Sequence, residues 1–231
     1  MTKLDGAVVL VTGANGGLGK EFVAQAVERG AAKVYATART PQEWDDTRVV
    51  PLVLDVTDQA SVRAAAEAAA DVTVLINNAG IWTDASLLNK DLASARAIFE
   101  TNFWGQLAVT NEFASALKQG SGALVNVLSV VSWLAVADAY SATKAAMWSA
   151  TNAQRLAFAG DDVQVMGLHL GYTDTPLAAG IDVDKNDPAD VVTAAYNGLE
   201  AGEIEVLADQ ISRQVKAGLS GPVGALYPQL G

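Results

Sequence analysis

Cysteine is absent from this chain of 231 residues, and histidine occurs once. Without cysteine the chain can form neither a disulfide bond nor a thiolate zinc site, and a single histidine cannot make a histidine cluster. Carboxylates alone could still hold a hard cation. Metal chemistry is therefore not expected.

Apolar runs of about 18 or more residues, the length that a membrane crossing needs, are also lacking, and residues 1–6 show no apolar signal segment. Basic residues are scarce: 15 Lys and Arg oppose 26 Asp and Glu, and the formal net charge is -11. An acidic surface repels nucleic acid and anionic membranes, so neither is expected as a partner. We expect a soluble, cytoplasmic protein.

Apolar residues make up 51% of the chain, and short apolar runs alternate with helical patterns along it. Strands are predicted over residues 7–11, 33–37, 49–54, 72–77, 123–128, 163–170 and 204–207. Helices are predicted over residues 17–29, 58–70, 91–118, 138–158 and 188–200, the last with Asp187 as its N-cap. Strands that are apolar throughout indicate a parallel sheet covered on both faces. The predicted fold is a doubly wound α/β sheet of seven strands in a single domain, residues 1–231.

Two segments fall outside this alternation. Residues 39–48 look too short, and too broken by Pro41, for a full helix between the second and third strands. The Gly- and Pro-rich tail over residues 218–231 is expected to serve surface packing or a subunit contact.

A glycine-rich turn with the sequence T-G-A-N-G-G-L-G, residues 12–19, joins the first strand to the first helix. At such a junction the backbone amides and the positive end of the helix dipole converge on a pyrophosphate, and a Cβ would block the close approach. An ordinary strand-to-helix turn is the alternative interpretation. The residues predicted to bind a dinucleotide here are Gly13, Asn15, Gly17, Leu18 and Gly19.

The spacing T-G-x-x-x-G-x-G resembles that of classical short-chain dehydrogenases/reductases, and further motifs of that family follow in order over essentially the whole chain. They are Asp55-Val56, Asn77-Asn78-Ala79-Gly80, Asn102, Ser129, Tyr140-x-x-x-Lys144 and Gly171-Tyr172-Thr173-Asp174-Thr175. The resemblance implies an NADP-dependent Rossmann-fold oxidoreductase of the carbonyl reductase or alcohol dehydrogenase type.

The resemblance also assigns cofactor contacts. It implies that Asp55 and Val56 touch the adenine, and that the backbone of residues 78–80 lines the cofactor. Loop residues after the sixth predicted strand would meet the carboxamide and phosphates. The cofactor-binding residues implied in this way are Asp55, Val56, Asn78, Ala79, Gly80, Tyr140, Lys144, Gly171, Thr173 and Thr175. Asp55 could instead cap a helix, and Asn78 could stabilise a turn.

The end of the second predicted strand indicates which dinucleotide binds. An NAD-specific site places an acidic side chain there, whereas this chain has Ala38 followed by Arg39, a planar and permanently charged donor suited to a 2′-phosphate. NADP(H) is therefore preferred and NAD(H) stays possible, since Asn15 stands where many NADP-using relatives have a second basic residue. Arg39 could instead form a surface ion pair with Glu43 or Asp45.

Tyr140 and Lys144 are four residues apart in a predicted helix, so their side chains share one face. Lowering a phenol pKa from about 10 by about three units requires roughly 4 kcal/mol. One ammonium about 4 Å away supplies about that much at an effective dielectric near 20. We expect Tyr140 to be the general acid/base.

The remaining catalytic candidates follow from the resemblance. Ser129 would hydrogen-bond the substrate oxygen, with Ser132 as an alternative. Lys144 would also bind the nicotinamide ribose, and Asn102, a poor helix former, would support a water that returns protons; a solvated helical asparagine is the alternative. A lone histidine such as His169 indicates a buried, hydrogen-bonded side chain rather than a catalyst. Leu170 stands where the family usually has proline.

Only about a dozen residues separate Thr175 from the predicted cap at residue 187, where many members of the family that the chain resembles carry a longer lid. The resemblance therefore implies an open cleft that binds bulky or varied carbonyl compounds weakly. The aromatic residues expected near this cleft are Trp82, Trp133 and Tyr172, although each could be core or subunit contact. Relatives pair subunits through the two long helices that carry Trp104 and Trp148 here. A homodimer or homotetramer is expected by resemblance.

The sequence has two alternative functional interpretations. A catalytically silent NADP(H) sensor or scaffold would keep the glycine-rich turn, but the intact catalytic residues oppose it. A sugar-nucleotide epimerase or dehydratase needs a C-terminal substrate domain, and about 55 residues after Thr175 leave no room for one. The preferred prediction is hydride transfer between NADP(H) and a small-molecule carbonyl or alcohol.

Overall fold

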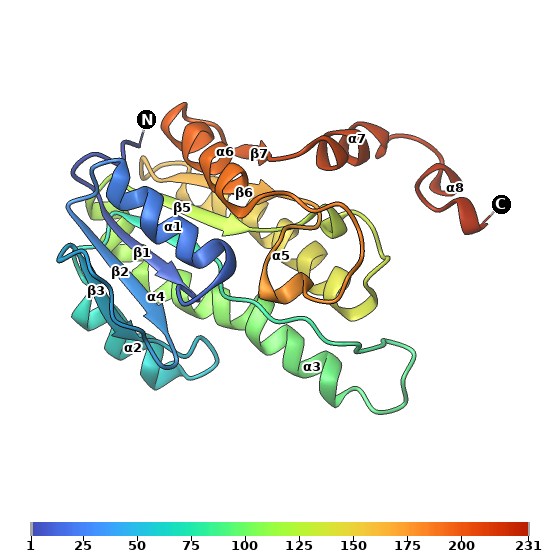
Figure 1. Ribbon diagram of the computed structural model, residues 1–231, viewed down its shortest axis with the longest axis horizontal. Coiled ribbons are helices and arrows are strands. Elements are labelled where there is room, and N and C mark those ends of the chain that lie inside the picture. Colours follow the sequence, from blue (N-terminus) through green and yellow to red (C-terminus); the bar gives the residue numbers. More distant parts are fainter. Residues whose placement is uncertain (1, 231) are drawn as a thin grey trace.

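The computed structural model describes residues 2–230, which fold around one seven-stranded sheet (Figure 1). The strands are β1 (Val8–Thr12), β2 (Lys33–Ala38), β3 (Val49–Val53), β4 (Val74–Asn77), β5 (Ala123–Val127), β6 (Gln164–His169) and β7 (Glu205–Leu207). Their order in the sheet is β3-β2-β1-β4-β5-β6-β7, and every neighbouring pair is parallel. The predicted doubly wound fold is confirmed.

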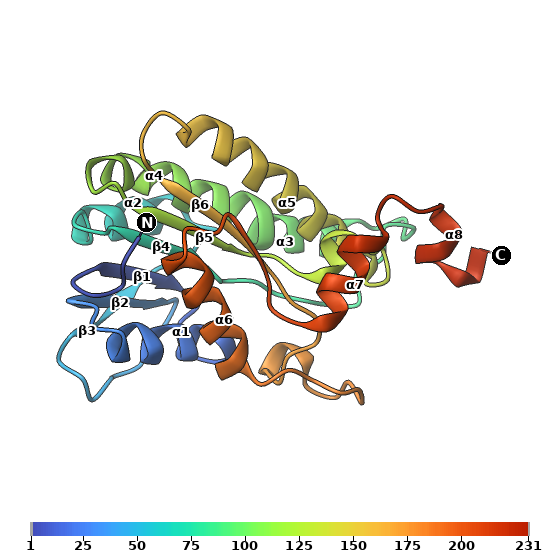
Figure 2. The same cartoon turned by 90° about the horizontal axis from the view of Figure 1, so that it is seen from above.

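Helices cover both faces of the sheet (Figure 2). One face carries α1 (Gly17–Glu28) and α6 (Pro188–Glu200). The other carries α2 (Gln59–Ala68), α3 (Ala93–Phe99), α4 (Gln106–Gln119) and α5 (Asp138–Phe158). Asp187 caps α6 as predicted, because its carboxylate accepts a hydrogen bond of 2.8 Å from the amide of Ala189. No full helix forms between β2 and β3, in agreement with the sequence.

Strand β1 shows why these apolar runs form central strands. Val9 and Val11 pack into one hydrophobic cluster with α1 and α6, whereas Leu10 packs into a second cluster with α2 and α4. Successive strand residues point to opposite faces, so a strand buried on both faces is apolar at consecutive positions, as β1 is from Val8 to Val11. The first cluster includes Phe22 and Tyr196, whose rings meet edge to face at 5.5 Å.

The long helix predicted over residues 91–118 is interrupted. Between α3 and α4 lies a π-helical segment, η1 (Glu100–Gly105), which contains Asn102. At the end of this segment Gly105 approaches Val56 so closely that a Cβ on the glycine would lie 2.8 Å from a Val56 methyl carbon. The helical periodicity of the sequence gave no sign of this local widening, which in other proteins often marks a functional site.

The sequence pattern missed the helix α7 (Gln210–Gly218), which is followed by the short α8 (Val223–Leu226). Both reach away from the sheet in Figure 1. Beyond them Tyr227 accepts a 2.9 Å hydrogen bond from the amide of Ala135, so the tail packs on the loop before α5. Among residues 2–230, no helix has both the length and the apolar character that crossing a membrane requires.

Candidate active site

A cleft of about 1000 Å³ runs along the carboxyl ends of the strands. The predicted site residues that line it are Gly13, Asn15, Gly17, Leu18, Arg39, Asp55, Val56, Asn78, Ala79, Gly80, Ser129, Tyr140, Lys144, Gly171, Thr173 and Thr175. Two predicted residues, Gly19 and Asn102, do not line it. The crevice outside the carboxyl ends of the strands, where the strand order reverses, is where doubly wound sheets bind ligands.

The glycine-rich turn brings the start of α1 against the loop after β6. Gly17 has a φ of +50°, and a Cβ there would lie 3.1 Å from Thr175, so glycine allows both the backbone conformation and the contact. Gly19 lies behind the turn: a Cβ on it would be 2.1 Å from the carbonyl oxygen of Gly13. Its role is therefore close packing of the helix on the turn rather than a direct contact with a ligand.

The turn after β1 is tied to the turn after β4 by the hydroxyl of Thr12. This oxygen accepts hydrogen bonds of 2.9 Å from the amides of Asn78 and Ala79. The Asn78 side chain donates in return to the carbonyls of Thr12 at 2.8 Å and Gly13 at 3.2 Å. Asn78 therefore stabilises the turn, which was its alternative role in the sequence analysis, and it also lines the cleft.

Arg39 and Asp55 lie at the end of the cleft next to β2 and β3. Arg39 is exposed and, within residues 2–230, pairs with neither Glu43 nor Asp45. Hydrogen bonds from Thr57, and then the charge of Arg39, lower the pKa of Asp55. A cation is thus available where the sequence predicted it.

Ser129 and Tyr140 face the same cleft from the two ends of one loop. Ser129 caps a 3₁₀ turn, η2 (Val130–Ser132), with its hydroxyl accepting from the amide of Val131 at 3.3 Å and donating to the carbonyl of Leu170 at 3.3 Å. The alternative, Ser132, is buried and does not line the cleft. The geometry therefore favours Ser129.

Lys144 lies one helical turn beyond Tyr140 in α5 and is buried. Its ammonium donates a 2.7 Å hydrogen bond to the carbonyl of Val127 and lies 5.6 Å from the centre of the Tyr140 ring. Burial lowers the pKa of Lys144 to about 8 and raises the pKa of the Tyr140 phenol. Burial thus opposes ionisation of both groups. The sequence predicts that the Lys144 ammonium lowers the pKa of the phenol, but in the protein without cofactor that pKa is raised.

Asn102 is fully buried, so the alternative of a solvated helical asparagine is wrong. Its carboxamide oxygen accepts from the amide of Ile81 at 2.8 Å, and its nitrogen donates to the Ile81 carbonyl at 2.8 Å and to the Thr143 hydroxyl at 3.3 Å. Asn102 therefore fixes the segment after β4 against α5, the helix that carries Tyr140 and Lys144.

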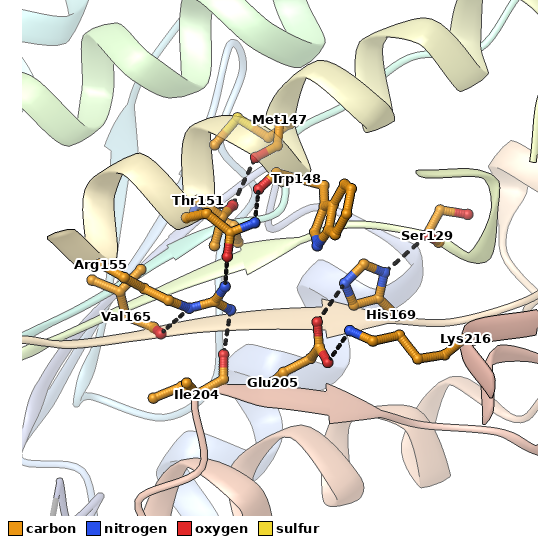
Figure 3. A network of polar contacts seen from close by, with 12 residues as sticks. Ser129, Met147, Trp148, Thr151, Arg155, Val165, His169, Ile204, Glu205 and Lys216 are labelled. Carbon is orange, nitrogen blue, oxygen red and sulfur yellow. Dashed lines mark hydrogen bonds and ion pairs between the residues drawn. The ribbon is translucent and has the colours of Figure 1, made fainter. Parts of the chain in front are cut away.

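His169, the last residue of β6, is buried behind Ser129, as Figure 3 shows. Its Nδ1 lies 3.1 Å from the Ser129 carbonyl oxygen, which can only accept, so Nδ1 carries the proton. Its Nε2 lies 3.7 Å from Glu205, which pairs with Lys216. Burial lowers the pKa of His169 to about 4, so the imidazole is neutral at neutral pH. The histidine is buried as predicted, but it is not fully satisfied, because its Nε2 has no hydrogen-bond partner within residues 2–230.

The aromatic residues divide between cleft and core. Trp82 and Tyr172 line the cleft as predicted. Trp133 takes the alternative position in the core: it is buried and stacks on the His169 ring at 4.0 Å between centroids. It lies behind the loop because its indole packs among His169, Trp148 and the Lys216 ammonium.

The loop over residues 171–187 is held at both ends by Asp209, which the sequence did not single out. This buried carboxylate accepts from the amide of Gly171 at 2.5 Å, the side chain of Asn186 at 2.8 Å and the amide of Ser212 at 2.7 Å. Burial alone would raise the pKa of Asp209, but hydrogen bonds from these groups outweigh it and lower the pKa. The carboxylate is therefore charged at neutral pH.

Other residues of the cleft also escaped the motif-based predictions. They are apolar positions without a spacing signal, on loops, on 3₁₀ turns and at the start of α7: Ile81, Val131, Leu134, Val136, Leu177, Ile181 and Ile211. Among residues 2–230 no three His, Asp or Glu side chains are grouped so as to hold a metal ion.

The chain is similar to proteins of one family. Residues 7–186 match the model of the short chain dehydrogenases. A short chain dehydrogenase from Burkholderia cenocepacia J2315 in complex with NADP superposes with a TM-score of 0.92 at 35% identity, covering 99% of each chain. The ketoacyl reductase HetN of Nostoc sp. is 30% identical over 91% of this chain and 81% of its own length. The L-tagatose-forming galactitol 2-dehydrogenase of Cereibacter sphaeroides is 34% identical over 76% and 74%.

These similarities cover most of the chain, and the family model matches well over half of it. The fold and the order of the motifs along the cleft agree with them. The chain therefore belongs to the short-chain dehydrogenase family of oxidoreductases.

Proposed function

We propose that the protein transfers hydride between NADP(H) and a ketone, aldehyde or secondary alcohol, with Tyr140 as general acid/base. The observation that carries this proposal is the joint placement of Ser129, Tyr140 and Lys144 along one cleft with the glycine-rich turn. A fold alone does not support a function. Support comes from one cleft that combines a proton carrier, a hydroxyl that can bind the substrate oxygen, and a turn suited to phosphate.

The cleft fits a dinucleotide. Helix α1 has no side chain capping its first amides, and its first two residues, Gly17 and Leu18, line the cleft. These amides and the helix dipole are suited to a pyrophosphate, and NADP(H), when bound, would supply the hydride. Arg39 would hold the 2′-phosphate. The NADP complex of the Burkholderia cenocepacia relative supports this preference, and NAD(H) stays possible.

In this reaction Tyr140 would donate its proton to the carbonyl oxygen during reduction and take it back during oxidation. Ser129 would turn its hydroxyl from the Leu170 carbonyl to the substrate oxygen. Lys144 would bind the nicotinamide ribose and stabilise the phenolate. Asn102 would act as a positioning residue through its bonds to the Ile81 backbone and Thr143.

We also propose a homodimer or homotetramer in the cytoplasm. Trp104 on η1 is 55% exposed, which is unusual for so large an apolar side chain and suits a subunit contact. Trp148 on α5 is half-buried and meets the Trp133 ring edge to face at 6.2 Å, so it contributes less free surface.

The test is the absorbance of reduced nicotinamide in the presence of purified protein and a panel of aromatic, aliphatic and cyclic ketones. We expect oxidation of NADPH in preference to NADH. Tight binding of the cofactor without turnover across the whole panel would instead favour the silent sensor.

A further inference from the structure

The cleft has two parts that differ in chemistry. The part next to β1, β2 and β3 holds the glycine-rich turn, Arg39 and Asp55. The other part, called here the outer pocket, lies beyond Ser129 and Tyr140. Its walls come from the segment after β4, the loop between η2 and α5, the loop after β6, and α7. If the cofactor occupies the first part, as proposed above, the outer pocket receives the substrate.

The outer pocket is lined by hydrocarbon. Six of its side chains are Ile81, Val131, Leu134, Val136, Leu177 and Ile181. The ionisable Asp, Glu, Lys, Arg and His side chains that line the whole cleft are Arg39, Asp55 and Lys144, and none of these belongs to the outer pocket. A carboxylate or phosphate buried here would lose its hydration without gaining an opposite charge, which is costly.

Three exposed aspartates, called here the rim, stand next in the sequence to residues that line the cleft. They are Asp138 beside Ala137, Asp174 between Thr173 and Thr175, and Asp182 beside Ile181. The loop over residues 171–187 contains four aspartates and one basic residue, Lys185. Together with the formal net charge of -11, this rim repels anions as they approach.

We infer that the substrate is an uncharged ketone, or the corresponding secondary alcohol, with hydrocarbon groups on its carbonyl. This inference rests on the proposed function and narrows it. Carbonyl compounds that carry a carboxylate or a phosphate, including acyl groups on a phosphate-bearing carrier, are disfavoured by both the walls and the rim. Polyols are disfavoured because most of the walls are aliphatic side chains, which offer no partners for hydroxyl groups; Trp82 and Tyr172 are the polar-tipped exceptions.

Methyl 4-acetylbenzoate and 4-acetylbenzoate test this inference, because they share a ring and a ketone and differ in one negative charge. With NADPH we expect kcat/KM to be at least about 100-fold higher for the ester. Equal or faster turnover of the carboxylate would overturn the inference and leave the proposed function standing. Turnover of no ketone at all would overturn the proposed function and the inference with it.

A charge placed in the pocket provides a second test. Val136 lines the outer pocket and is 61% exposed, so the variant Val136→Arg should fold. The added cation should raise kcat/KM for the carboxylate by about tenfold and lower kcat/KM for the ester. Leu156→Arg, on the 80% exposed Leu156 of α5 outside the cleft, changes the net charge equally and should alter neither value. Equal responses of the two variants would show that the outer pocket does not select the substrate.

Discussion

The relative position of Tyr140 and Lys144 could be predicted directly from the sequence. A spacing of four residues in a helix is enough to predict that both side chains face one site, and the structure has them on α5 along one cleft. The environment of these residues was not predictable in the same way. Burial, which depends on the whole fold, raises the pKa of Tyr140 and lowers that of Lys144.

Tyr140→Phe removes the proton carrier and leaves the ring in place. We expect turnover to fall by about 10²- to 10⁴-fold, the usual contribution of general acid catalysis, with NADPH affinity nearly unchanged. Steady-state kinetics and fluorescence titration with NADPH measure the two quantities. Tyr35→Phe, which removes a tyrosine hydroxyl outside the cleft, is the control and should keep ordinary turnover. Ordinary activity in Tyr140→Phe would show that another group carries the proton.

Arg39→Ala tests the choice of dinucleotide. Removing a charged hydrogen-bond donor to phosphate should raise KM for NADPH by about tenfold or more and change KM for NADH little. Arg48→Ala is the matched control, because that exposed arginine is already paired with Asp46 at 2.8 Å and lies outside the cleft. A similar loss for both cofactors would contradict the assignment of the 2′-phosphate.

Among the elements, the strands could be predicted from their apolar runs, whereas the π-helical segment and the short helix α7 could not. Strand β1 is apolar from Val8 to Val11 because both its faces are buried, and such a pattern is visible in the sequence. The π-helical segment η1 depends on the close approach of Gly105 to Val56, a tertiary contact. Helix α7 has 9 residues, too few for its periodicity to stand out beside the tail.

The loop over residues 171–187 depends on one carboxylate from another element. Asp209→Asn keeps a good N-cap for α7 but removes the charge that holds Gly171 and Asn186. We expect kcat/KM to fall by about tenfold, mainly through KM, because charged hydrogen bonds are stronger than neutral ones. Asp187→Asn makes the same change in the exposed cap of α6 and should stay within about twofold of the wild type. Equal kinetics of the two variants would show that Asp209 does not position the loop.

On the scale of the whole molecule, the alternation of strands and helices predicted that helices cover both faces of the sheet. It also predicted that the site lies at the carboxyl ends of the strands. The two hydrophobic clusters on either face agree with that prediction. The character of the outer pocket was not predictable, because its walls come from loops that meet only in the folded chain. The position of Trp133 was unpredictable for the same reason: nothing in its sequence neighbourhood indicates the stacking on His169.

Stability of the folded chain should depend on pH through His169. Because the folded-state pKa is about 4 and the ordinary value is 6.5, the unfolded chain binds more protons between these values. This contribution is therefore complete above about pH 6.5 and is lost as pH falls toward 4; the loss between pH 8 and pH 5 amounts to about 2 kcal/mol. Urea unfolding at pH 8 and pH 5 measures it. His169→Asn, which cannot titrate, should lose about 2 kcal/mol less than the wild type, and an identical loss would contradict the buried neutral imidazole.

Transfer of deuterium from NADPH labelled with two deuterium atoms at C4 of its nicotinamide tests the proposed reaction most directly. After incubation with methyl 4-acetylbenzoate, mass spectrometry should find one deuterium on the carbinol carbon of the alcohol product. Tyr140→Phe should give little of this product in the same time. An alcohol without deuterium, or no alcohol from any ketone of the panel, would contradict hydride transfer from NADPH as the function of this cleft.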